Sequence, residues 1–226
     1  DEEGRWKVVR EEIEEIQATY AGKTDTRRTL IEAEEEVEFT ADDFIVEEDN
    51  VVIVSRDGWL KRQKEVRDLS TTRLREGDVV LAAVAGSTRA SMALFTNVGT
   101  AYTCRIDDVP ASTGYGEPVQ KLFKLRDGER VIAAFSLDPR TIGKIDARKE
   151  GDPPPVHALA VTSDGYSLRF SFEPFVEPST RAGRRYARPR AGREVVGVAR
   201  VTGEEVVIAA THEARAILCR ADEVNY

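Results

Sequence analysis

An internal repeat of β-hairpin patterns leaves this chain few possible folds. Each copy has an apolar or β-branched run, a polar turn and a second, alternating strand. The four copies are residues 51–66, 92–109, 158–175 and 206–224. Gly58, Gly99 and Gly165 occupy the first three turns, where a positive φ angle favours glycine, and Glu213–Ala214 is a weaker turn signal in the fourth. The repeat predicts a mainly β chain.

A further strand pattern follows each of the first three hairpins, after a polar loop of 15 to 20 residues. These strands are expected at residues 78–85, 130–137 and 194–201. The turns are 41, 66 and 49 residues apart, and the longest interval carries an inserted loop at residues 138–155. A four-stranded unit that recurs at roughly this period is typical of a propeller-like array, in which stacked units bury both faces of each small sheet.

The residues before position 50 follow a different pattern. An apolar seam with the 3.5-residue period of a coiled coil consists of Trp6, Val9, Ile13, Ile16 and Tyr20. Two heptads are too short for a stable coiled coil alone, so this helix either docks on its own domain or ends a longer coiled coil, and its polar remaining surface favours the second. We therefore expect a coiled-coil helix at 1–24, an acidic linker at 25–49 and the β-domain at 50–226.

Charge is distributed unevenly along the chain. The formal net charge is −8, but residues 1–50 alone hold 18 acids and 6 bases, a balance of −12, which leaves +4 for the remainder. Residues 179–193, STRAGRRYARPRAGR, contain six arginines and no acid. The acidic total therefore does not exclude a polyanionic partner for the β-domain.

Composition and motifs give no sign of a membrane, redox, metal or catalytic site. No apolar run approaches the roughly 20 residues that cross a bilayer, and the opening DEEGRWK is unlike a secretory signal. Cys104 and Cys219 fall at the same place in two hairpins, which predicts small packing residues. His157 and His212 stand outside any ligand cluster, which favours structural roles. We expect a cytoplasmic protein without a cofactor or metal of its own.

Three segments carry a family resemblance: residues 11–31, 47–62 and 210–226. They resemble the C-terminal part of the A-type subunit of bacterial type IIA topoisomerases, DNA gyrase and topoisomerase IV. EEIEEIQATYAGKTDTRRTLI (11–31) is similar to the end of that subunit's coiled coil and the linker with its paired arginine. EEDNVVIVSRDGWLKR (47–62) and ATHEARAILCRADEVNY (210–226) are similar to blades of its C-terminal domain. The resemblance implies a β-pinwheel, a propeller-like disc whose blades exchange a strand with a neighbour and whose basic rim binds and bends duplex DNA.

The resemblance also implies partners and cofactors for the complete enzyme. These are a B-type ATPase subunit, ATP and Mg²⁺, with a dimeric full subunit, a monomeric isolated domain and a location at the bacterial nucleoid and chromosome. Residues 62–78 lack the Gln-Arg-Arg-Gly-Gly-x-Gly box that follows the first blade in gyrase, which favours a topoisomerase IV-like or weaker role. Relatives have five or six blades and this sequence has four hairpins, so a C-terminally truncated domain and an incomplete, C-shaped disc both stay open.

Basic residues in two loops are the candidate DNA contacts. Arginine suits bidentate binding of successive phosphates when no carboxylate competes. The arginine loop supplies Arg181, Arg184, Arg185, Arg188, Arg190 and Arg193, and the loop after the first hairpin supplies Lys61, Arg62, Lys64, Arg67, Arg73 and Arg75. Ordinary solvated loops are the alternative for both stretches. A propeller-like interaction module that binds an acidic partner is the alternative function, and a stand-alone enzyme is disfavoured because no catalytic constellation can be assembled.

Two further features bear on this assignment. Arg185–Tyr186 has the order of the DNA-cleaving dipeptide of type IIA topoisomerases, but that tyrosine belongs to a winged-helix domain upstream of the coiled coil, so we expect Tyr186 at most to touch a sugar-phosphate. The acidic runs at 32–39, 41–44 and 47–50 lack the spacing of a calcium loop. They are hypothesised to lie over the basic rim and to weaken DNA binding.

Overall fold

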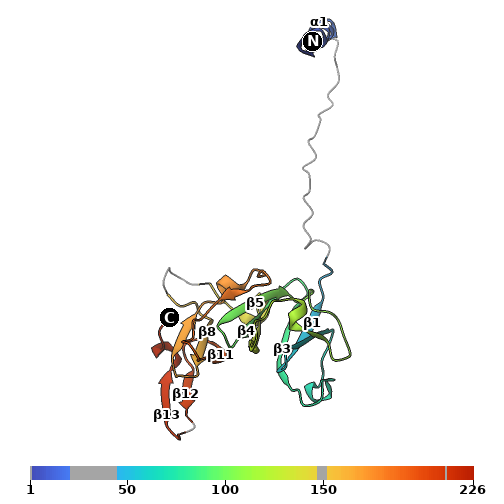
Figure 1. Ribbon diagram of the computed structural model, residues 1–226. Helices are drawn as coiled ribbons and strands as arrows, with labels where there is room; N and C mark the ends of the chain where they lie inside the picture. The colour runs from blue at the N-terminus through green and yellow to red at the C-terminus, as the bar shows by residue number, and fades with distance from the viewer. Residues whose placement is uncertain (1, 21–44, 147–151, 212) are drawn as a thin grey trace. The chain divides into compact units, whose positions relative to one another are not determined.

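The computed structural model describes residues 2–20, 45–146, 152–211 and 213–226 (Figure 1). The chain divides into two compact units, Asp1–Phe39 and Thr40–Tyr226. In the first unit the structure describes helix α1 (Glu2–Tyr20), which confirms the predicted helix. All five residues of its apolar seam are exposed. Most of the predicted acidic linker lies outside the described residues.

The described residues of the second unit form four antiparallel sheets, which we number as blades 1 to 4 in chain order. Blade 1 has the order β3-β1-β2-β6 and consists of β1 (Asp49–Ser55), β2 (Trp59–Gln63), β3 (Val80–Ser87) and β6 (Glu117–Pro118). Blade 2 has the order β10-β5-β4-β7 and consists of β4 (Ser91–Thr96), β5 (Thr100–Arg105), β7 (Val131–Ser136) and β10 (Arg184–Arg185). Blade 3 has the order β11-β8-β9 and consists of β8 (His157–Thr162), β9 (Ser167–Phe170) and β11 (Val195–Val201). Blade 4 pairs β12 (Val206–Ala210) with β13 (Ala216–Arg220). The four predicted hairpins and the three predicted outer strands are all present.

The fourth strand of a blade comes from the loop of the next blade. β6 lies between β5 and β7 in the sequence but pairs with β2, and β10 lies between β9 and β11 but pairs with β5. This is the strand exchange that the resemblance implied. Blades 1 and 2 have the four strands that the repeat predicts, and blades 3 and 4 have three and two strands in the described part of the chain.

The four hairpin turns share one geometry. In each, the amide of the turn residue donates to the carbonyl oxygen three positions earlier, at 2.9–3.1 Å. Gly58, Gly99 and Gly165 have φ angles of +82°, +81° and +85°. Ala214, in the fourth turn, has a φ of +61° and is the one non-glycine residue with positive φ in the described chain. The weaker turn signal in the fourth repeat therefore coincides with a conformation that costs alanine more than glycine.

Apolar side chains fill the spaces between successive blades. Val52, Val54 and Leu94 are fully buried in the cluster that joins blades 1 and 2. Phe95 of blade 2 packs edge-on against Phe172 and Tyr186 from the blade 3 loop, with ring centroids 6.1 and 5.0 Å apart. Burying one such aromatic side chain contributes about 2–3 kcal/mol. Stacking of neighbours thus buries both faces of the central sheets, as the repeat pattern predicts.

The two cysteines occupy equivalent strand positions, opposite Met92 in β5 and opposite Val207 in β13. Cys104 is buried, and this burial raises the pKa of its thiol to about 12. Cys219 is partly buried against the small cluster of blades 3 and 4. Both thiols are free. The prediction that they are packing residues is confirmed.

A side chain near the end of the second hairpin strand links each blade to the segment that follows the next hairpin. Arg62 Nε donates to the Val109 carbonyl oxygen at 3.0 Å, and Thr103 Oγ1 donates to that of Phe175 at 2.9 Å. Arg169 Nε donates to the Val224 carbonyl oxygen at 2.6 Å. The same cross-blade hydrogen bond therefore recurs at three junctions.

Short helices occupy the loops between strands. Single-turn 3₁₀ helices are η2 (Leu69–Thr71), η3 (Val119–Lys121), η4 (Glu173–Phe175) and η5 (Ala221–Glu223). The predicted inserted loop at 138–155 begins with helix α2 (Pro139–Ile142), whose N-cap is Asp138. Asp138 is buried and accepts hydrogen bonds from the Ser87 amide and from Arg140, which also pairs with Asp49 at 2.7 Å.

Candidate nucleic-acid interface

The arginine loop, residues 179–193, crosses from blade 3 to blade 2. Its central dipeptide forms β10, in which Arg184 lies opposite Ala101 and Arg185 opposite Thr100. Gly183 precedes this strand with a φ of +71°, and a Cβ there would lie 2.7 Å from the Ala101 carbonyl oxygen. Only glycine fits this close approach. The loop is therefore fixed to a sheet in its middle.

Two arginines of this loop are used to anchor it. Arg184 is half-buried and donates to the carbonyl oxygens of Pro174, Glu177 and Pro178 at 2.7–3.2 Å. Arg181 is exposed but donates to backbone carbonyls of the blade 2 loop at 3.2 and 3.4 Å. Arg184 was predicted as a phosphate contact, whereas its guanidinium group is engaged with the protein's own backbone.

The other four arginines of the loop face solvent. Arg185, Arg188 and Arg193 are exposed, and none of their side chains has a hydrogen bond or ion pair to another described residue. Arg190 is exposed and lies over the ring of Tyr166, 4.1 Å from its centroid, with Asp164 4.0 Å away. Three guanidinium groups without an ion pair, next to one with a distant carboxylate, attract an anion to this loop.

Tyr186 lies inside the protein. It is 8% exposed and its hydroxyl donates to the Thr96 carbonyl oxygen at 2.7 Å. Burial raises the pKa of this hydroxyl above its ordinary value, and the charge of Glu129 adds to the effect. The expectation of contact with a sugar-phosphate is wrong for this conformation, and the ring is a packing residue between blades 2 and 3.

Lys61, a predicted DNA contact of the first basic stretch, lies inside the protein. Lys61 is 1% exposed, and its Nζ donates to the carbonyl oxygens of Arg73 and Gly114 at 2.6 and 2.9 Å. Burial lowers the pKa of this amine, and the Arg73 charge lowers it further. The sequence does not show which side chains of β2 point inward, because no apolar residue alternates with the polar ones in Lys61, Arg62, Gln63 and Lys64.

The next basic side chains are paired with acids. Arg62 lies 2.8 Å from Asp107, and its side chain is 18% exposed, so it serves the blade junction. Lys64 lies 3.3 Å from Glu48 and Arg67 lies 3.2 Å from Glu65. The last two are exposed pairs of the kind that contribute little and open readily. They remain accessible to a stronger anion.

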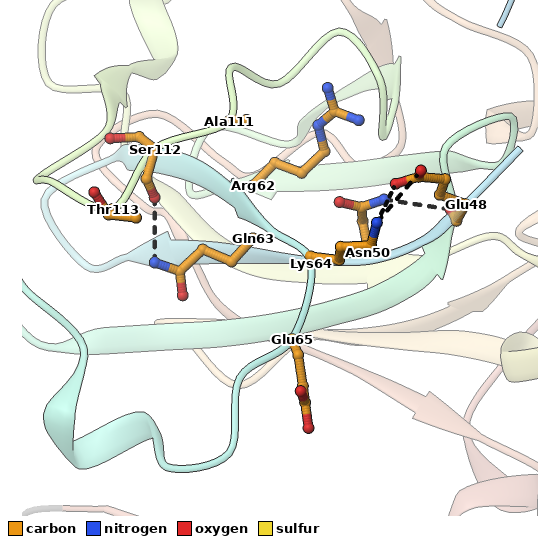
Figure 2. A pocket seen from close by; sticks show the side chains of 9 residues that line it. All are labelled: Glu48, Asn50, Arg62, Gln63, Lys64, Glu65, Ala111, Ser112 and Thr113. Atoms are coloured by element: carbon orange, nitrogen blue, oxygen red, sulfur yellow. Dashed lines mark hydrogen bonds and ion pairs between the residues drawn. The ribbon is translucent and has the colours of Figure 1, made fainter. Parts of the chain in front are cut away.

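An open pocket of about 990 Å³ lies beside these pairs (Figure 2). Figure 2 shows Gln63 reaching toward the Ser112 carbonyl, at 3.2 Å, and Lys64 toward Glu48. Both basic side chains of the lining are thus opposed by carboxylates. The pocket is less suited to a polyanion than the arginine loop.

Arg73 and Arg75 are exposed and lie over aromatic rings. The Arg75 guanidinium carbon is 3.9 Å from the centroid of the Trp59 ring, and that of Arg73 is 5.6 Å from the Tyr115 centroid. These distances are within the range of cation–π attraction. The two arginines keep their hydrogen-bonding edges free for a ligand.

Sequence reasoning missed Arg126. It begins the turn Arg126-Asp127-Gly128, which precedes β7 as Arg75-Glu76-Gly77 precedes β3 and Arg190-Ala191-Gly192 precedes β11. In all three turns the amide of the fourth residue donates to the arginine carbonyl, at 2.9–3.1 Å. The recurring Arg-x-Gly, five residues before each outer strand, was the available signal. Arg181-Ala182-Gly183 has the same letters but precedes β10.

His157 is a buried residue of blade 3. Its Nδ1 donates to the Pro154 carbonyl oxygen at 3.0 Å, and burial lowers its pKa. His212 lies outside the described residues. The described chain contains no group of three or more His, Cys, Asp and Glu residues placed to hold a metal ion. No helix in the described residues is long and apolar enough to cross a membrane.

By its fold, the β-domain is a propeller-like β-pinwheel. The family model described as "DNA gyrase C-terminal domain, beta-propeller" matches residues 91–138 and 157–202. The C-terminal domain of DNA topoisomerase IV superposes with a TM-score of 0.68 at 19% identity, over 80% of this chain and 55% of that one. The E. coli ParC C-terminal domain superposes with a TM-score of 0.61 at 20% identity, over 78% of this chain and 66% of that one.

Curated relatives agree with this fold. The gyrase A protein of Aminobacterium colombiense is 27% identical over 96% of this chain and 26% of its own length. That of Pseudomonas aeruginosa is 32% identical over 58% of this chain and 15% of its own length. The β-domain is thus similar in sequence and fold to the C-terminal domain of the A-type subunits of type IIA topoisomerases, the resemblance that the sequence indicates. The chain spans about a quarter or less of the length of these relatives.

Proposed function

We propose that the β-domain binds duplex DNA without sequence specificity and bends it along the arginine loop. The observation that carries the proposal is the exposure of Arg185, Arg188, Arg190 and Arg193 on one loop, with no carboxylate closer than 4.0 Å to any of them among the described residues. Arginines placed in this way can meet successive phosphates, which is the main source of nonspecific affinity for DNA.

The fold supports bending more than base recognition. The described part of the chain has no exposed helix on the β-domain that could enter a major groove, since its helices there are one turn long. The free arginines belong to a loop that is held between two blades, so its charges keep a fixed position. Backbone contacts along a rigid surface favour a duplex that follows that surface.

A titration of DNA binding against salt tests the proposal. Four phosphate contacts predict a log–log slope of the binding constant of about −4. Reversing Arg185, Arg188 and Arg193 to Glu should abolish most binding in a gel shift. Reversing Arg5, Lys7 and Arg10 of α1 gives the same change in net charge and serves as the control. Equal losses in both variants, or binding to an acidic peptide but not to DNA, would contradict the proposal.

Bending needs a separate measurement. A DNA fragment of about 150 bp, one persistence length, closes into a circle more readily when a bound protein bends it. We expect the wild-type chain to raise the ligation yield of circles and the reversed variant to leave it unchanged. Affinity without any change in circularisation would reduce the function to binding alone.

We further propose that this domain serves an A-type topoisomerase subunit by presenting a DNA segment for strand passage. The similarity to gyrase A and topoisomerase IV domains supports this role, and the ATPase partner, ATP and Mg²⁺ would belong to the complete enzyme. The same three reversals in the complete subunit should lower supercoiling or decatenation while DNA cleavage is retained. Loss of cleavage would point to a different role.

A further inference from the structure

We infer that Arg75, Arg126 and Arg190 form a repeat-related row of phosphate contacts, and that Trp59 and Tyr166 are positioning residues for two of them. The inference rests on the proposed binding of DNA and specifies where each blade touches the duplex. Two of these arginines were predicted individually, but the row and its aromatic supports follow from the structure.

Register places the three arginines at the same end of their blades. The outer strand after each Arg-x-Gly turn begins opposite the last residue before the hairpin turn: Val80 opposite Ser55, Val131 opposite Thr96 and Val195 opposite Thr162. Each arginine therefore stands beside the hairpin turn of its own blade. A contact repeated at one end of successive blades follows the arc of the blades rather than a straight line.

The acid at the fourth position of the first two turns is used by the fold and does not neutralise the arginine. Asp78 is buried, and one of its carboxylate oxygens accepts from the Asp57 and Val79 amides at 3.1 and 2.8 Å. Glu129 is buried and accepts from Thr96 Oγ1, at 2.7 Å, and from Tyr102, at 3.1 Å.

Exposed acids next to the row are few. Glu76 and Asp127 occupy the middle position of their turns, and neither is paired with the arginine beside it. In the third turn the position of Asp78 and Glu129 is taken by Arg193. Asp164, 4.0 Å from Arg190, is largely buried. Among their exposed side chains the three turns hold four arginines and two acids, so the exposed charge of the row is positive.

The residue after each hairpin glycine decides how the arginine is held. It is Trp59 in blade 1, Thr100 in blade 2 and Tyr166 in blade 3. Stacking at 3.9 and 4.1 Å covers one face of the Arg75 and Arg190 guanidinium groups, and the N–H groups of Arg75 have no partner among the described residues. The hydroxyl of Tyr166 also accepts from Arg190 Nη2 at 2.8 Å. Fixing a flexible side chain before binding reduces the entropy lost when it meets a phosphate.

Salt-dependent DNA binding by the full chain tests both parts. Arg75→Ala should lower the magnitude of the log–log slope by about 0.9, the value of one phosphate contact. Trp59→Leu keeps the charge and should weaken affinity about two- to fivefold with the slope unchanged. In the Arg75→Ala background, Trp59→Leu should cost nothing more, because the ring acts only through the arginine.

Companion variants separate positioning from folding. Trp59→Phe keeps a ring and should bind within twofold of the wild type, whereas Arg75→Lys keeps the charge and should resemble Trp59→Leu. Arg89→Ala, an exposed arginine at the opposite end of blade 1, should leave slope and affinity unchanged. An unchanged slope in Arg75→Ala, or equal losses from Trp59→Leu in both backgrounds, would overturn the inference alone. Absence of DNA binding by the wild-type chain would overturn it together with the proposed function.

Discussion

The basic segment of blade 1 and the arginine loop of blade 3 each supply six predicted contacts, yet the protein uses them differently. In blade 1, Lys61 is buried and Arg62 holds a blade junction. Lys64 and Arg67 face acids of their own segment or of the strand entry. In the arginine loop, Arg181 and Arg184 donate to backbone carbonyls. Arg185, Arg188 and Arg193 have no side-chain hydrogen bond or ion pair in the described chain.

The difference shows that the acids near a basic side chain indicate whether it is free to bind DNA. The number of basic residues in a segment is a poorer guide. Acids interrupt the blade 1 segment at Glu65, Asp68 and Glu76, and none interrupts residues 179–193. A basic residue beside a buried acceptor acquires a structural role, because an unsatisfied buried acceptor is costly. Changes at Lys61 and Arg62 of the blade 1 segment are therefore expected to affect stability. Changes at Arg185, Arg188 and Arg193 of the loop are expected to affect binding.

The largest effect on stability is expected at Lys61. Lys61→Met keeps the length of the side chain but leaves the Arg73 and Gly114 carbonyls without their donor. The free energy of unfolding should fall by about 2–3 kcal/mol in urea denaturation. Lys64→Met, at a side chain that is 78% exposed, should stay within about 0.5 kcal/mol of the wild type. Equal losses of unfolding free energy at both positions would contradict the different roles of the buried and the exposed lysine of blade 1.

Asp138 adds to the comparison a buried carboxylate that is hydrogen-bonded only within the protein. Hydrogen bonds from Arg140 lower the pKa of Asp138 from 3.8 to about 2. Because the folded pKa is lowered, the stabilisation is complete above about pH 5 and is lost as the pH falls toward 2, a change of roughly 2 kcal/mol. Urea unfolding between pH 5 and pH 2 should show this loss, and Asp138→Asn should remove that part of the pH dependence. Parallel pH curves for the two proteins would refute the assignment.

A smaller loss is expected at the blade junction. Arg62→Ala removes the hydrogen bond to Val109 and the pair with Asp107, so stability should fall by about 1–2 kcal/mol. Thr103→Val tests the equivalent bond in blade 2 and should cost about 1 kcal/mol. DNA affinity at matched folded fraction should not change for either variant. A loss of DNA affinity in Arg62→Ala but not in Thr103→Val would show that Arg62 contacts DNA.

The smallest effect on stability is expected in the arginine loop. Arg188→Ala should leave the free energy of unfolding within about 0.5 kcal/mol of the wild type, because the side chain is exposed. Its DNA affinity should fall several-fold, with the salt slope smaller in magnitude by about 0.9. Arg67→Ala, already opposed by Glu65, should change the slope by less. The reverse ranking would show that the acid-interrupted segment is the better DNA contact.

Hairpins and outer strands could be read from the sequence because alternation and turn glycines report local geometry. The exchanged strands could not, since β6 and β10 are two residues long and carry no periodicity. The arginine loop was visible as a charge cluster, but the inward direction of Lys61 and the anchoring of Arg184 depend on partners 6 to 53 residues away. Arg126 is recognised only when the loops before the outer strands are aligned with one another, because the turns that begin with Arg75, Arg126 and Arg190 lie there and not in the hairpins.

The exchanged strand of blade 2 has a consequence for the order of synthesis. β10 begins about 80 residues after β5 ends. At about 5–20 residues per second, a ribosome needs roughly four to sixteen seconds to make that interval. During this interval one edge of β5 lacks its partner β10. Its unpaired backbone groups can then pair with a strand of another nascent chain. Translation pauses between residues 106 and 183 would lengthen this exposure, so chaperone contact is expected to concentrate there.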